Sequence, residues 1–397
     1  MTDSNTNRQC RTDDRAVSEI LGAIMVFGIL LALLFLIQMT AVPTWNQQVE
    51  YDHDQRVQGD VGEIGNAIER VQASGTAESV GVELGLRYPY RPLLYNPPAV
   101  SGELQTVPNG DIVVEGANAS DEVGDFWDGS ELSYPTRSIT YSADYNEYND
   151  APVRTVYEHG TVANRFDGEV TIVRQPRQVV RDNAINLVAL TGEVDRDSVE
   201  PTTVQVTPVT RSARTISVTG ANGDDITISL RTTLPEATWN ELLADELDNG
   251  HVLSVDYTAA TSPATVTITL DGAETYTLRT ALVGVGTNLD ETQPAYLERI
   301  AGGGEFVPVG ASDRLTVEVR DQFNAPVTGV DVTYDVVEGS GEFVGDSTPG
   351  DNSHTRQSDS NGQTSVVFEP GTTGTVTVEA TANLNGVAGT QEEEVVR

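Results

Sequence analysis

One uninterrupted apolar run constrains this chain most. Residues 20–37 read ILGAIMVFGILLALLFLI, with no charged or polar side chain. As a helix rising about 1.5 Å per residue, the run would be roughly 27 Å long, close to the hydrocarbon thickness of a bilayer. The rest of the chain, beyond this run, is polar, acidic and rich in alternating strand patterns. We therefore expect a membrane-spanning helix over residues 17–42 that carries a large extramembrane body.

The charges that flank the run predict its orientation. Arg8, Arg11 and Arg15 precede it within the leader 1–16, and after the run no charge appears until Glu50. Because Arg and Lys favour the cytoplasmic side, we expect the leader to be cytoplasmic and the body extracellular, in a single pass. A cleaved secretory signal is the alternative. Its apolar core is shorter and a small-residue cleavage site comes after it, so the full-length run favours retention in the cell membrane.

Composition restricts the environment and the partners of the body. The 397 residues include 60 acidic and 23 basic side chains, for a net charge of −37, and every basic residue is Arg. Such a charge repels itself in dilute buffer, whereas molar salt shortens the Debye length to about 3 Å and screens the repulsion. The composition resembles that of secreted proteins of halophilic archaea. A GC-rich genome would explain Arg in place of Lys, but not the acid excess. Nucleic acid is not an expected partner.

After the run, apolar residues recur at a spacing of 4-3-4-3 and predict an amphipathic stalk helix over residues 43–75. The stripe has two readings: it forms a seam between copies of the chain, or it packs on the chain's own body. Pro43 is placed to kink this helix, and three glycines weaken it. The stripe consists of Val57, Val61, Ile64, Ile68 and Val71.

Residues 76–300 predict a β-rich extracellular domain, with two subdomains as an alternative. Alternating residues flank Asn222-Gly223 and Asp271-Gly272, and both dipeptides favour a tight hairpin turn. A short helix is expected after Pro235, with Trp239 on its apolar face.

Two segments of this domain, 87–98 and 133–160, are rich in tyrosine. They predict either a docking or glycan-binding face, or tyrosines that fill the core.

Residues 305–397 alternate cleanly in about six or seven short strands, which predicts an Ig-like β-sandwich. Residues 301–310 read as a linker followed by the first strand. The expected fold class is mainly β, with a long N-terminal transmembrane and amphipathic helix, a β-rich middle domain and a C-terminal sandwich.

Catalytic and metal-binding patterns are not found in the sequence. The four histidines are far from one another and from the one cysteine, Cys10, so no zinc motif exists. Without lysine there is no P-loop, and we expect no enzyme activity, no metal site and no cofactor. Calcium could bind the acidic loops 195–197 or 359–361, although such acids more often face water. Asn118 begins an N-glycosylation triplet.

The segment DDRAVSEILGAIMV resembles the start of haloarchaeal type IV pilin-like proteins. The resemblance implies that a prepilin peptidase cuts between Ala16 and Val17, and that residues 17–73 assemble a homo-oligomer or filament. Glu19 would then be the third mature residue and a subunit contact, where many members of the family have proline. The alternative for Glu19 is an acid at the edge of the membrane.

Residues 321–327, DQFNAPV, and 359–364, DSNGQT, resemble two motifs of bacterial Ig-like group 1 domains, the invasin and intimin type. Phe323 replaces the glycine usual before Asn324. The resemblance implies a cell-surface adhesion or stalk module without a catalytic site.

Three functions remain open. The first is a pilin-like surface subunit with an adhesive tip. The second is a monomeric anchored surface protein whose Ig-like domain is a spacer. The third is a surface-anchored hydrolase.

Overall fold

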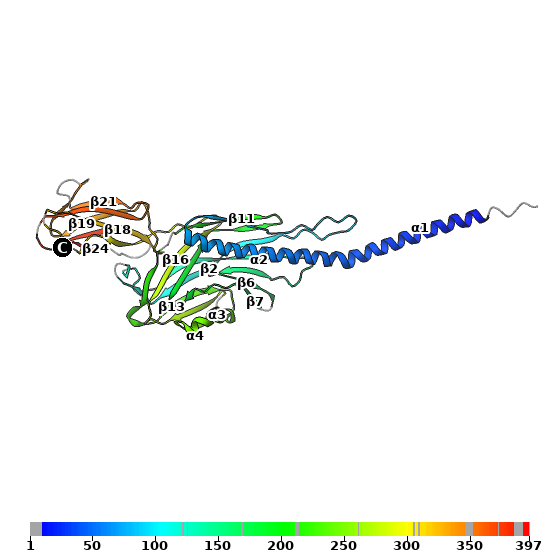
Figure 1. Ribbon diagram of the computed structural model, residues 1–397, viewed down its shortest axis with the longest axis horizontal. Helices are drawn as coiled ribbons and strands as arrows, with labels where there is room; N and C mark the ends of the chain where they lie inside the picture. Colours follow the sequence, from blue (N-terminus) through cyan, green and yellow to red (C-terminus); the bar gives the residue numbers. More distant parts are fainter. Residues whose placement is uncertain are drawn as a thin grey trace, which may run out of the picture.

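The computed structural model describes residues 10–120, 123–124, 126–167, 170–210, 214–260, 262–304, 306–308, 310–345, 352–371, 373–384 and 392–396. Helix α1 projects from one end of an elongated β-rich body, and a separate β-sandwich occupies the opposite end (Figure 1). The predicted fold class, mainly β with a long N-terminal helix and an Ig-like sandwich, is confirmed.

The amino-terminal helix is continuous through three segments. α1 (Cys10–Leu36) leads into a π-helical stretch, η1 (Ile37–Ala41), and then into α2 (Val42–Ser74). Pro43 is the second residue of α2, which directly follows the π-helical stretch, and the helix runs on through it. Gly75 ends α2 at φ 64°, and its N–H donates to Val71 O at 2.8 Å.

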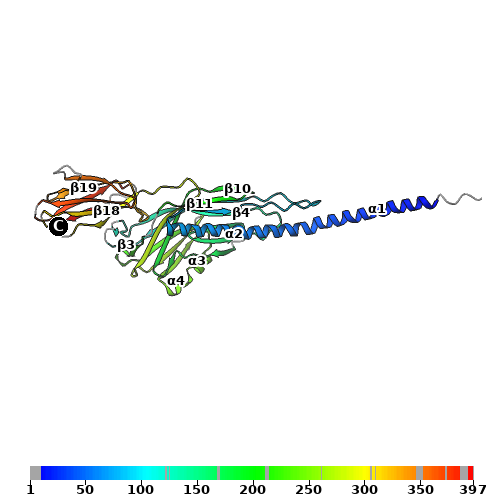
Figure 2. The ribbon, with the colours of Figure 1, turned by 45° about the horizontal axis from the view of Figure 1, so that its top comes forward.

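Two sheets form the body and enclose α2 (Figure 2). One has seven strands: β1 (Glu78–Val82), β3 (Ala117–Ala119), β8 (Val180–Arg181), β9 (Ala184–Thr191), β11 (Thr202–Pro208), β12 (Ile216–Gly220) and β16 (Tyr276–Val285). The other has nine: β2 (Gly102–Glu115), β4 (Leu132–Ala143), β5 (Arg154–Glu158), β6 (Thr161–Arg165), β7 (Thr171–Gln175), β10 (Asp195–Ser198), β13 (Ile226–Thr232), β14 (Val252–Thr258) and β15 (Ala264–Leu270). Among the described strands of the body, β9 and β16 pair in parallel and the others pair antiparallel.

The apolar stripe of α2 lies inside this body. All five of its side chains are 0% exposed and share one core cluster with residues of both sheets, such as Val206 and Tyr157. Two of the glycines that weaken α2 allow this close approach. A Cβ at Gly65 would lie 3.0 Å from the Tyr157 ring, and one at Gly62 would lie 2.6 Å from Gln175 Nε2. Of the two readings of the stripe, the structure has the one in which it packs on the chain's own body.

Neither predicted hairpin forms, although both turns exist. β12 and β13 flank the Asn222-Gly223 turn, where φ is 56° and 82°, yet they belong to different sheets. β15 and β16 likewise flank Asp271-Gly272 and lie in different sheets. Both connections are corners between the sheets, and they touch: Gly220 N–H donates to Gly272 O at 2.9 Å. The turn dipeptides determine where the chain turns. They do not determine which sheet the next strand joins, because an alternating strand can pair in either sheet.

The helix expected after Pro235 is two short helices, α3 (Glu236–Leu242) and α4 (Ala244–Asn249). Trp239 is 2% exposed and anchors α3 in the larger core cluster of the body.

The carboxy-terminal sandwich has two four-stranded sheets. One contains β17 (Pro294–Ala301), β18 (Asp313–Asp321), β20 (Gly341–Phe343) and β22 (Gln363–Pro370); the other contains β19 (Asp331–Glu338), β21 (Ser353–Gln357), β23 (Val376–Ala382) and β24 (Glu392–Val396). β17 precedes residue 305, the expected start of this unit, yet it pairs with β18. The glycine-rich segment after it therefore connects two strands of the sandwich, and residues 306–308 are not a strand.

Candidate functional site

Three regions of the structure bear on function: the exposed part of the helix, the place where the body grips it, and the junction with the sandwich. On the helix, large apolar side chains from Val17 to Leu36 are mostly half or more exposed, such as Phe27 at 62% and Leu30 at 58%. One helix in the described residues is long and apolar enough to cross a membrane, and it includes this stretch.

The body grips the helix just beyond the apolar run, through two segments that we call the collar, residues 87–98 and 144–150. Its central group is Glu50, which is 0% exposed. The Glu50 carboxylate accepts hydrogen bonds from the Tyr88 hydroxyl and from the backbone N–H groups of Asn146, Glu147 and Tyr148. A buried carboxylate satisfied in this way holds both collar segments on one face of α2.

A second polar layer lies one turn further along α2. Burial lowers the pKa of His53, so its ring is neutral at pH 7. Its Nε2 lies 3.0 Å from Glu83 O, which can only accept, so Nδ1 accepts from the Tyr145 hydroxyl at 2.7 Å. Burial also raises the pKa of Asp54, whose carboxylate accepts from Gln58 Nε2 at 2.6 Å. These groups fix the orientation of α2 in the body.

The sequence left two roles open for the tyrosine-rich segments, a docking or glycan-binding face and the filling of the core. Tyr134, Tyr141 and Tyr157 are buried in the body, whereas Tyr90 and Tyr95 are 88% and 76% exposed. The core prediction therefore holds for these three tyrosines, whereas a docking or glycan-binding role for the exposed tip of 87–98 stays a prediction.

At the far end, aromatic stacking joins the sandwich to the body. Phe323 is 2% exposed, and its ring centroid lies 5.0 Å from that of Tyr134 in β4. Tyr296 of β17 stacks on Phe126 at 5.0 Å. The Tyr134 hydroxyl donates to Gln322 O at 3.2 Å. Phe323, which replaces the usual motif glycine, is thus one of the two aromatic side chains through which the sandwich packs on the body.

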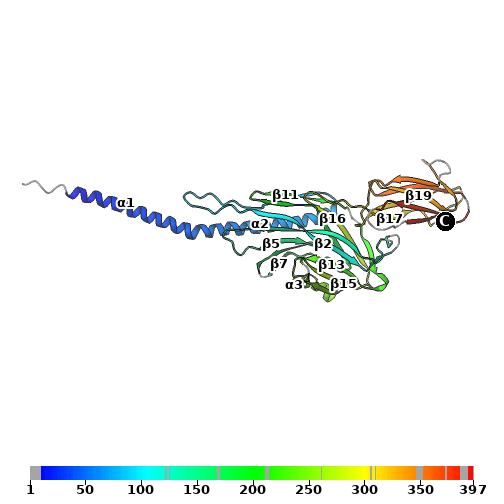
Figure 3. The same ribbon diagram turned by 180° about the vertical axis from the view of Figure 1, so that it is seen from behind.

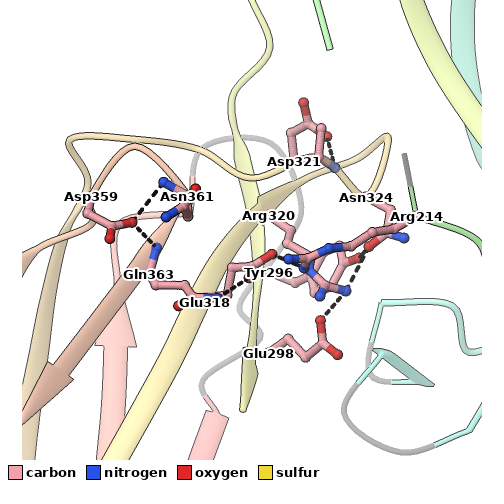
Figure 4. Close-up of polar contacts among 11 residues, drawn as sticks. Arg214, Tyr296, Glu298, Glu318, Arg320, Asp321, Asn324, Asp359, Asn361 and Gln363 are labelled. Carbon is pink, nitrogen blue, oxygen red and sulfur yellow. Dashed lines mark hydrogen bonds and ion pairs between the residues drawn. The ribbon is translucent and has the colours of Figure 1, made fainter. Parts of the chain in front are cut away.

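A buried ionic network continues this junction (Figure 4). Glu318 is 0% exposed and accepts from Arg320 Nε at 3.0 Å, from Gln363 Nε2 at 3.0 Å and from Arg214 of the body. Arg320 also donates to Asn324 Oδ1 at 2.8 Å, which in turn accepts from the Tyr296 hydroxyl. The ion pair between Arg214 and Glu318 crosses from one domain to the other.

The two loop motifs of the sandwich are held by aspartates. Asp321 Oδ1 accepts from Phe323 N at 2.8 Å and from Ala325 N at 2.9 Å. Burial raises the pKa of Asp321 to about 6. Asp359 Oδ1 accepts from Asn361 N at 2.8 Å and from Gln363 N at 3.0 Å. Their carboxylates cap turns, which is the structural use of such side chains.

One cavity of about 940 Å³ lies between the end of α2 and the sheets. Among its titratable groups, Glu69 is ion-paired with Arg177, and His159 Nε2 lies 2.7 Å from Arg231 O. Its described lining has no Ser, Thr or Cys. Within the described ranges, no group of three His, Cys, Asp or Glu is arranged to hold a metal ion.

The predicted site residues lie at two separate places, the start of the exposed helix and strand β3. Val17 and Glu19 are exposed on α1, next to Ala16 in the same helix. Asn118 is half-buried in β3, and its glycosylation stays a prediction, as do cleavage at Ala16–Val17 and the contact through Glu19. Sequence reasoning missed Glu50 and Glu318. The one signal in the sequence was an acid at a spacing that continues the apolar stripe: Glu50 lies seven residues before Val57.

No protein-family model matches the chain. A curated protein of Archaeoglobus fulgidus, described as an uncharacterized protein, is 25% identical over 337 residues, which is 82% of this chain and 55% of that protein. The chain thus spans about half the length of the curated relative it matches.

Several solved structures match part of the chain with low scores. The D00–D0 domain of intimin is 11% identical with a TM-score of 0.21, over 36% of this chain and 77% of that one. The adhesin InvE of Yersinia pseudotuberculosis is 17% identical with a TM-score of 0.21, over 44% and 54%. A beta-glucuronidase of Parabacteroides merdae is 10% identical with a TM-score of 0.20, over 53% and 24%. Scores this low carry no argument about function.

Proposed function

We propose that this chain is a non-enzymatic, single-pass membrane protein that displays an Ig-like sandwich on the outside of a halophilic archaeal cell. One observation carries the proposal: an apolar helix stands free of the body at the end opposite the sandwich (Figure 1). Each large apolar side chain left in water forgoes about 1.5–3 kcal/mol of burial, so a bilayer or neighbouring helices must cover this stretch. The three arginines of the leader support a cytoplasmic amino terminus.

The junction supports a display role. Aromatic contacts and an ion pair from Arg214 to the buried Glu318 join the sandwich to the body. Because α2 lies in the core of that body, anchor and sandwich are mechanically continuous. The loop motifs at 321–327 and 359–364 resemble those of invasin-type modules, so we propose contact with other surfaces as the role of the sandwich.

Membrane anchoring is tested with Leu30→Arg. A charge in the middle of the apolar run costs about 2.5–3.5 kcal/mol of insertion, so membrane retention should fall sharply. Gln47→Arg is the matched control, because Gln47 is exposed on the same helix beyond the run. Carbonate-washed membranes are blotted for each chain. Equal retention of the Leu30→Arg chain and the parent would refute anchoring by this helix.

A pilin-like subunit is the first form of this proposal, and a monomeric anchored protein is the second. The helix favours the pilin-like form, because its apolar part is exposed and can contact neighbouring subunits, while α2 is covered by its own body. We therefore propose that a filament would form through residues 17–41 instead of 17–73. The mature amino terminus, read by mass spectrometry, separates the two forms. A start at Val17 supports cleavage by a prepilin peptidase after Ala16, whereas an intact leader would exclude the pilin-like form.

A further inference from the structure

Loop 87–98 extends away from the body and runs beside the helix. It is the light-blue loop that runs along the helix toward α1 in Figure 1, and the view from behind in Figure 3 shows the same course. Two hydrogen bonds fix its position: Gln38 Nε2 donates to Tyr95 O at 2.9 Å, and Tyr95 N donates to Gln38 Oε1 at 2.9 Å. Gln38 is the first polar residue after the apolar run. The loop therefore ends level with the boundary of the expected span.

The tip of this loop presents large apolar and aromatic side chains to its surroundings. Tyr90 is 88% exposed, Leu93 is 87% exposed and Tyr95 is 76% exposed. Leu93 adopts a φ of 66°, a left-handed conformation that costs a residue with a Cβ about 1 kcal/mol or more. A strained turn that holds a leucine in water stabilises nothing within the chain, so it points to a partner outside it.

The charge of this segment is opposite to that of the chain as a whole. Residues 84–102 contain no Asp or Glu and include two arginines, in a chain with 60 acidic residues. Arg87 is ion-paired with Glu200 of the body at 2.6 Å, which leaves the charge of Arg91. Arg91 donates to Asn46 Oδ1 at 2.7 Å and to Asn96 Oδ1 at 2.6 Å, both neutral amides, and lies 5.4 Å from the centre of the Trp45 ring. Within the described part of the chain, its positive charge is thus not neutralised by a bonded carboxylate.

These features match the chemistry of a lipid headgroup layer. Tyr and Trp rings settle at the boundary between hydrocarbon and water, a leucine inserts just below it, and an arginine meets lipid phosphate. Pro89, Pro92, Pro97 and Pro98 restrict the loop, so little conformational entropy is lost when it binds. Trp45 is 46% exposed beside Arg91 and would lie in the same layer.

We propose that loop 87–98 is a second membrane contact, a foot that rests in the outer headgroup layer and fixes the tilt of the body on the bilayer. This inference rests on the proposed function, because the loop meets lipid only if the adjacent helix spans the bilayer. The foot and the helix would together hold the body at two points on the membrane.

The test uses the full chain with Cys10→Ser, reconstituted at high lipid-to-protein ratio in phosphatidylglycerol–phosphatidylcholine vesicles. Single cysteines replace Leu93, Leu30 or Phe306, and each carries an environment-sensitive fluorophore. Phe306 is the control, because it is 86% exposed and lies at the sandwich end of the molecule. Lipids with a quencher at a shallow or a deep acyl position report the depth of each fluorophore.

We expect shallow quenching of the Leu93 probe several-fold above that of the Phe306 probe, and deep quenching of the Leu30 probe. Tyr90→Ser with Tyr95→Ser should reduce the Leu93 signal, with circular dichroism unchanged. If the Leu93 probe is as exposed to water as the Phe306 probe while the Leu30 probe is deeply quenched, the proposed membrane contact of loop 87–98 is wrong and the anchoring proposal stands. An unquenched Leu30 probe would overturn the anchoring proposal itself. Disulfide cross-linking between chains of the unlabelled Leu93→Cys variant would show that the loop contacts a second copy of the chain, and would also contradict the proposed membrane contact.

Discussion

The junction between body and sandwich gives the most quantitative prediction. Phe323→Ala removes a ring that is 2% exposed, and such truncations in a packed site cost about 3–5 kcal/mol. The ring belongs to the sandwich, but its contacts lie in the core cluster of the body. The loss should therefore appear as weaker coupling between the two domains.

A double-mutant cycle measures that coupling. The ring centroids of Tyr134 and Phe323 lie 5.0 Å apart with the rings tilted by 43°, and an aromatic pair contributes about 0.5–1.5 kcal/mol beyond the area it buries. We expect Phe323→Ala and Tyr134→Ala to be non-additive by about 1–2 kcal/mol in urea unfolding of the full chain at fixed high salt. Phe368→Ala is the control, because Phe368 is 0% exposed in the separate core of the sandwich and should be additive with Tyr134→Ala.

An additive result for Phe323 and Tyr134, equal to that of the control pair, would refute the view that this aromatic contact joins the domains.

Four other perturbations test the buried acids, a tight turn and the salt requirement. Asp321→Asn keeps an oxygen for both N–H donors but cannot ionise. Because burial raises the pKa of Asp321 from 3.8 to about 6, the folded parent binds more protons than the unfolded parent between these values and loses stability as pH rises through that window. The variant should therefore gain about 2 kcal/mol relative to the parent from pH 4 to pH 7 in urea unfolding; a pH-independent difference would contradict this. Glu50→Ala leaves buried donors unpaired and should destabilise by about 3 kcal/mol or more, whereas exposed Asp52→Ala should change little in the same assay. Gly272→Ala would push a methyl group into Asp224 O and lower the unfolding free energy by about 1–3 kcal/mol, unlike Gly81→Ala, which meets no atom within 4 Å. Finally, the full chain in detergent should lose folded structure by circular dichroism in about 0.1 M salt but not in about 3 M, and equal stability in both would argue against halophily.

The salt experiment needs the full chain because α2 is part of the body's core. The sequence alone predicts that a soluble fragment beginning after the stalk helix 43–75 contains the whole β-rich domain. That fragment would lack α2, whose apolar stripe is 0% exposed in a core of the body. The stripe had two readings because periodicity records which face of a helix is apolar and not what covers that face.

The collar and the junction show why polar sites were harder to predict. In the sequence, Glu50 and Glu318 cannot be told from the many other acidic residues, yet both are fully buried in the structure. Their burial depends on donors from segments far along the chain, such as Tyr148 for Glu50 and Arg214 for Glu318. No local spacing brings such partners together, so only the assembled fold identifies them.

The sequence by itself determined the free apolar helix, the alternating strands, the sandwich and the positions of the turns, because each depends on local chemistry: side-chain polarity at a fixed period, or a residue that tolerates positive φ. Only the tertiary structure decided which sheet each strand joins. The turns at Asn222-Gly223 and Asp271-Gly272 lie where the sequence placed them, but β12 and β13, like β15 and β16, separate into different sheets. The reason is that a strand's N–H and C=O groups can pair with any neighbour that completes the ladder, and an alternating strand buries its apolar face equally well in either sheet.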